Sequence, residues 1–70
     1  MNNIIIFDLD IYSINYIYIA VNDYQKISKI NLEFKDNICL CTFEQYVTSV
    51  EIIIKEFCNY LIDLMNAVGK

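Results

Sequence analysis

The chain has 70 residues, 57% of them hydrophobic, and a net charge of −4 from nine acidic and five basic side chains. This length allows a single domain, which buries only about 60% of the surface of its unfolded chain. The basic residues are five scattered lysines without any arginine, which argues against nucleic-acid binding, while the apolar excess predicts association with itself or with another protein.

No export signal or membrane span is expected from the sequence. The first three residues carry no positive side chain, and the apolar run over residues 4–7 is too short for a signal core. The longer apolar stretches over residues 4–21 and 47–68 each contain several charged side chains or other polar residues, so neither predicts a spanning helix. We therefore expect a cytoplasmic protein.

The first expected elements are a strand and a helix. Residues 3–10 predict a buried strand, because four consecutive apolar residues leave no polar face. Ser13 is the expected N-cap of the helix that follows. Apolar side chains recur at helical spacing after it, at Ile14, Ile17, Val21 and Tyr24.

A hairpin is expected next. Residues 30–35 alternate between apolar and polar side chains, which is typical of a half-buried strand. Asp36 and Asn37 predict a tight turn, since both tolerate left-handed backbone angles. The return strand over residues 38–43 is apolar on both faces, so we expect it either at the centre of the sheet or against a partner.

The period becomes helical from about residue 44, and a helix is predicted over residues 46–67 with Gly69 as its stop. Its apolar stripe consists of Val47, Val50, Ile54, Phe57, Leu61, Leu64, Met65 and Val68. The predicted fold class is α+β: a single domain over residues 1–70, in which a two-layer β-α-β-β-α order gives a three-stranded sheet covered by two helices.

Three cysteines are the main candidates for metal chemistry. Cys39 and Cys41 are two residues apart on a predicted strand and so share a face, and Cys58 lies on the last predicted helix. The chain has no histidine, and a structural zinc site usually needs four ligands. We expect core thiols and no cofactor; a metal module completed by carboxylates is the less favoured alternative.

Catalysis by this chain is not expected. Asp8 and Asp10 lie at the end of a predicted strand and resemble the first motif of haloacid-dehalogenase-like phosphatases, but Ile11 and Tyr12 stand where that family has Gly and a Thr or Val. Without histidine there is no imidazole base, and no serine has the partners of a nucleophile. The two aspartates are therefore interpreted as solvated carboxylates at a strand end.

Two short segments frame the chain and carry a family resemblance. The first is Ile11-Tyr12-Ser13, followed by the predicted helix and hairpin, and the second is the spaced set Phe57, Asn59, Leu61 and Asp63. In this order they resemble the small D component of His-Xaa-Ser repeat peptide systems, the HxsD-like proteins. The chain departs from that pattern in lacking arginine and the Leu-Arg that often follows the second motif.

The resemblance implies a non-catalytic accessory protein in the maturation of a ribosomally made peptide. Such a protein would bind the precursor peptide, a radical-SAM maturase, or both. It implies Tyr12, Ser13, Asn59 and Asp63 as partner contacts; alternatively, the first two are an anchor and a helix cap, and the last two a solvated helix face. A different class is a self-associating structural or antitoxin-like protein, favoured by the apolar excess and the strand over residues 38–43.

Overall fold

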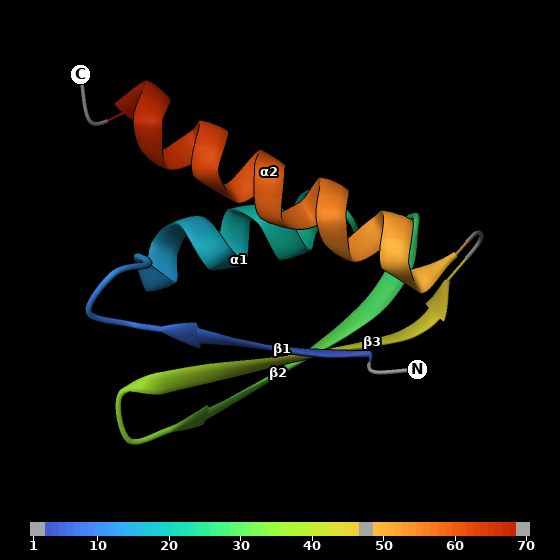
Figure 1. Ribbon diagram of the computed structural model, residues 1–70, viewed down its shortest axis with the longest axis horizontal. Coiled ribbons are helices and arrows are strands. Elements are labelled where there is room, and N and C mark those ends of the chain that lie inside the picture. Colours follow the sequence, from blue (N-terminus) through green and yellow to red (C-terminus); the bar gives the residue numbers. More distant parts are fainter. Residues whose placement is uncertain (1–2, 47–48, 69–70) are drawn as a thin grey trace.

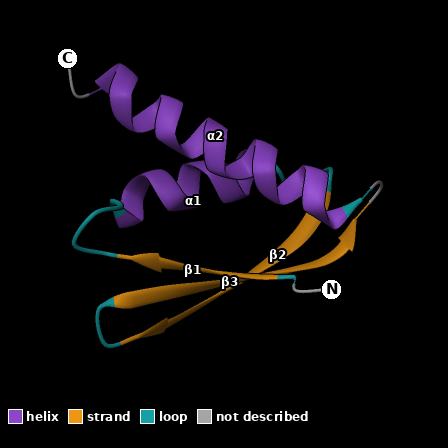
Figure 2. Ribbon diagram, in the orientation of Figure 1, coloured by secondary structure: helices purple, strands orange, loops and turns teal. Residues whose placement is uncertain are grey.

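The computed structural model describes residues 3–46 and 49–68, in which both helices lie on the same side of one sheet (Figures 1 and 2). This confirms the predicted α+β fold and its β-α-β-β-α order. The elements are β1 (Ile4–Asp8), α1 (Ile14–Asp23), β2 (Ser28–Lys35), β3 (Ile38–Tyr46) and α2 (Val50–Val68). The predictions for Val47 and Gly69 fall outside the described residues.

The sheet has the order β1-β3-β2, and both neighbouring pairs are antiparallel. β3 is therefore the central strand, as one of the two sequence alternatives predicted. β1 and β2 run parallel to each other at the two edges, because α1 carries the chain across β3.

The prediction that β1 is a buried strand is wrong for one of its faces. Phe7 points toward the helices and is buried, whereas Ile6 on the opposite face is 60% exposed and Ile4 is 40% exposed. The reason is that both helices cover the same face of the sheet, so a run of apolar residues on an edge strand buries only alternate side chains.

The core lies between the sheet and the helices and is centred on Phe57 of α2. Its buried ring meets Phe43 of β3 edge-on, with 5.3 Å between ring centroids, and Tyr24 in the same manner at 5.4 Å. The Phe7 ring lies 6.2 Å away at a tilt. The Phe57 side chain of α2 thus contacts the end of α1 and two strands of the sheet, β1 and β3.

Turn and cap residues occupy the predicted positions. Asp36 has a φ of 54°, in the left-handed region, between Lys35 and Ile38, which pair with each other. Ser13 is the N-cap of α1, with an extended backbone (φ −74°, ψ 130°), but its side chain makes no capping hydrogen bond. The position of this cap is confirmed, while its expected side-chain bond is missing.

The last helix begins later than the sequence predicted. β3 continues to Tyr46, and α2 starts at Val50 instead of residue 46. The buried side chains of α2 recur at Val50, Ile53, Phe57 and Leu61, which places one stripe of the helix against the core. Within the described parts of the chain, neither helix is both long and apolar enough to cross a membrane.

Candidate interaction surface

Residues 3–46 and 49–68 form no pocket. Over the same residues, no three side chains of the types that bind metals gather closely enough to hold an ion. The features described below are the surfaces formed by the sheet and by α2.

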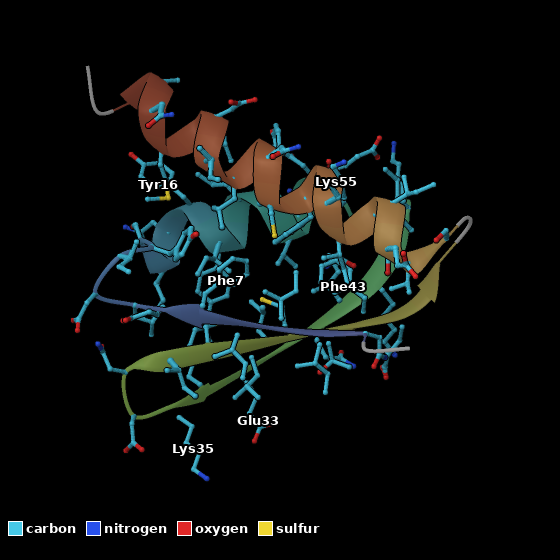
Figure 3. All side chains as sticks on the ribbon, in the orientation of Figure 1. Phe7, Tyr16, Glu33, Lys35, Phe43 and Lys55 are labelled. Carbon is cyan, nitrogen blue, oxygen red and sulfur yellow. The ribbon has the colours of Figure 1, made fainter. Side chains whose placement is uncertain are left out.

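The face of the sheet turned away from the helices, here called the open face, is built by the register of the three strands. Figure 3 shows Glu33 and Lys35 extending from it, opposite to Phe7 and Phe43, which lie between the sheet and the helices. Alternation along each strand assigns the open-face residues. They are Ile4, Ile6 and Asp8 on β1, Ile38, Leu40, Thr42 and Glu44 on β3, and Lys29, Asn31, Glu33 and Lys35 on β2.

This open face is divided into an apolar and a polar half. Ile6 lies opposite Leu40, and the rows on either side bring in Ile38 and Ile4. These four residues, Ile4, Ile6, Ile38 and Leu40, form what we call the apolar quadrant. The β2 side of the same face carries charges and an amide instead. Contiguous apolar surface of this kind, rimmed by polar residues, is typical of a protein-binding site.

The first pair of candidate residues has a structural role. The half-buried Tyr12 ring packs edge-on against Phe7 with 4.9 Å between centroids, and the Tyr12 N–H donates to the Asp8 carbonyl over 2.9 Å. The Ser13 carbonyl accepts the N–H of Ile17 over 3.1 Å, which begins α1. These contacts fix the entry into α1, and both side chains are half-buried.

The second pair is accessible. Asn59 and Asp63 are exposed and stand one turn apart on α2, so they share its outward face. Tyr60, between them in the sequence, instead donates a hydrogen bond from its hydroxyl to the Asp23 carboxylate at the end of α1. Tyr12 contacts the inner layer, whereas Asn59 and Asp63 face outward, so the two pairs do not define a single patch.

The three thiols pack in the core. Cys39 and Cys41 are buried with their Sγ atoms 3.9 Å apart, and Cys58 is half-buried on α2. Burial raises the pKa of all three thiols, most strongly that of Cys41, to which the neighbouring Cys39 and Cys58 add. Burial therefore favours the neutral form of each thiol, and a neutral thiol is a weaker nucleophile than a thiolate.

Asp8, the last residue of β1, and Asp10 form a turn. An oxygen of the Asp8 carboxylate accepts the N–H of Asp10 over 2.9 Å. The Asp8 carbonyl also accepts the N–H of Ile11 over 3.0 Å, so the chain reverses immediately after the strand. This is the local side-chain-to-backbone bonding for which aspartate is favoured in turns.

Sequence reasoning missed the apolar quadrant, because it treated the residue 4–7 run as buried on both faces. Part of the signal was recognised, because residues 38–43 were expected to be apolar on both faces, but Ile38 and Leu40 were not connected with Ile4 and Ile6. Comparisons with protein-family models, with curated proteins and with solved structures gave no match.

Proposed function

We propose that this chain is a non-catalytic accessory protein in the maturation of a ribosomally made peptide, and that it binds the precursor peptide or the radical-SAM maturase. The observation that carries a binding role is the apolar quadrant, which neither helix covers. The nature of the partner comes from the resemblance of the two framing segments to HxsD-like proteins.

The energetics of the quadrant suit a partner contact. Fully covering an isoleucine stabilises a complex by about 1.5–3 kcal/mol relative to leaving it in water, and Ile6 still has most of that gain available. Leu40 and Ile38 beside it are half-buried and add smaller amounts. A few such residues at the centre of a contact commonly supply most of its affinity.

The first test is to capture partners of the tagged chain from its native cytosol and to identify them by mass spectrometry. Recovery of an iron–sulfur radical-SAM enzyme or of a short precursor peptide is expected. The variant Ile6→Lys should reduce that recovery at least about tenfold, because a charge buried without a partner opposes binding. Ile52→Lys is the matched control, since Ile52 is exposed on α2, outside the quadrant and about two helical turns from Asn59.

Either of two results would overturn this role. One is capture of no protein other than the chain itself, and the other is undiminished binding by a folded Ile6→Lys protein. The double variant Asn59→Ala/Asp63→Ala tests the residues that the resemblance implies. If it folds normally and loses the partner, the outward face of α2 belongs to the contact; if binding is unchanged, these two side chains are only solvated.

A further inference from the structure

The outer edge of β2 exposes a row of main-chain groups. The Phe43 N–H donates to the Asn3 carbonyl, and the Asn37 carbonyl accepts the N–H of Leu9. The odd-numbered residues of β3 therefore direct their main-chain groups toward β1. Even-numbered residues of β3 therefore bond toward β2, where they oppose Asn31, Glu33 and Lys35. By alternation, the remaining β2 residues direct their N–H and C=O groups away from the sheet: Ile30, Leu32 and Phe34.

The two edges of the sheet differ in how open they are. β1 has five residues, and the Asp8 carbonyl at its end already accepts the N–H groups of Ile11 and Tyr12. β2 has eight residues and no proline, with a register shift only at its start, between Ser28 and Lys29. A long, regular edge of this kind is a template for another strand.

We propose that β2 pairs antiparallel with β2 of a second copy of this chain, about a twofold axis at Asn31, to form a six-stranded sheet. In this register Ile30 exchanges main-chain hydrogen bonds with Leu32 of the second copy. On the open face, Lys29 comes opposite Glu33 of the second copy, and Glu33 opposite its Lys29.

Several registers of the two β2 strands would keep the helices of both copies on one side of the sheet. The charges that face each other and the number of residues that pair favour the axis at Asn31. An axis at Leu32 would oppose Lys29 to Lys35, and an axis at Glu33 would oppose two like carboxylates. An axis at Phe34 matches Glu33 with Lys35 but pairs only the last few residues before the turn. The axis at Asn31 alone joins a long pairing to two opposite-charge contacts.

Exposed aromatic rings flank the same edge on its helix side. Tyr18 of α1 is 51% exposed and Phe34 of β2 is 40% exposed, and their ring centroids lie 5.9 Å apart. Ile14, one turn before Tyr18, continues this apolar border. A second copy docked at β2 removes part of this surface from water, which adds a hydrophobic contribution to the main-chain bonds.

The test uses charge reversal and sedimentation equilibrium. The wild-type chain should be a dimer, and Lys29→Glu and Glu33→Lys should each dissociate at least about tenfold more readily, because like charges then oppose each other. An equimolar mixture of the two variants should form a heterodimer, since every opposed pair in it is again of opposite sign. The double variant Lys29→Glu/Glu33→Lys should dimerise like the wild type.

Lys55→Glu and Glu56→Lys make the same charge changes on the exposed face of α2, away from β2, and should leave the dimer intact. Circular dichroism of each variant establishes that it is folded. The inference is overturned if the wild-type chain is monomeric at millimolar concentration, or if the mixed variants form no heterodimer. Such a result would leave the accessory role standing, because that role is tested at Ile6 on the β1 side of the sheet.

Discussion

Phe57 is the residue on which the core depends most. It is fully buried and contacts aromatic rings from β1, β3 and the end of α1. A 70-residue domain has a free energy of unfolding of about 4–10 kcal/mol. Phe57→Ala removes about 3–5 kcal/mol of it and should leave a large unfolded fraction, whereas Phe57→Leu costs about 1–2 kcal/mol.

Urea unfolding followed by circular dichroism measures both substitutions at Phe57. Ile62→Ala serves as the control, because this side chain is exposed on α2 and its truncation should change stability by no more than about 0.5 kcal/mol. A Phe57→Ala protein as stable as the wild type would contradict the packing described here.

The core thiols predict a loss of stability at alkaline pH. Burial raises the pKa of Cys39, Cys41 and Cys58 above the ordinary 9.0, so these thiols ionise at lower pH in the unfolded chain than in the folded one. The contribution of the thiols to the free energy of unfolding should be constant below about pH 8 and fall as the pH rises through 9 and beyond.

Urea unfolding between pH 7 and pH 10 measures this decline, which should be shallower in Cys41→Val, because that substitution removes the most strongly shifted thiol. Ile53→Val, a core change without a titrating group, should lower stability equally at every pH. An unchanged slope in Cys41→Val would show that the thiol does not drive the alkaline decline.

At the scale of the elements, the β2–β3 hairpin depends on one left-handed residue. Asp36, at φ 54°, tolerates this conformation, whereas a β-branched side chain there costs about 1–2 kcal/mol. Asp36→Val should therefore destabilise the protein by that amount, and Asp36→Gly should change stability by less than about 0.5 kcal/mol. Thermal unfolding distinguishes the two substitutions at Asp36, and Lys35→Val on the adjoining strand is a near-neutral control. Equal losses of stability in Asp36→Val and Asp36→Gly would contradict the role of the left-handed turn.

The elements themselves were largely predictable, because their periods are local properties of the sequence. The alternation before Asp36 and the apolar stripe around Phe57 each identify one kind of structure. Which strand lies at an edge is not local: β1 pairs with β3, at least thirty residues away, and skips β2. An apolar run such as that of β1 is compatible with a central strand and with an edge strand, so the sequence pattern does not distinguish the two.

The candidate site was predictable only in part for a related reason. Ser13 was identified as a cap from its neighbours in the sequence, and its position is confirmed. The apolar quadrant combines Ile6 with Leu40 through strand pairing, so no segment of sequence contains it. Its existence also depends on both helices lying on one face, which follows from the packing of the whole chain.

At the scale of the whole molecule, the proposed dimer would leave the accessory surface open. The two copies of β2 lie at the centre of the six-stranded sheet and β1 at each outer end, with both open faces on the same side of that sheet. Each quadrant then remains accessible, and a complex of two chains with two partners is expected. Native mass spectrometry of the captured complex measures how many copies of each component it contains. A complex of one chain with one partner would contradict the expectation.

The central place of β3 has a consequence for synthesis of the protein on the ribosome. β1 emerges first but has no strand to pair with until β3 is complete at Tyr46, and Phe57 follows later still. At translation rates of about 5–20 residues per second the apolar β1 waits for a few seconds without its neighbour. The sheet therefore cannot assemble in chain order: its first strand stays apolar and unpaired until the third strand has been synthesised.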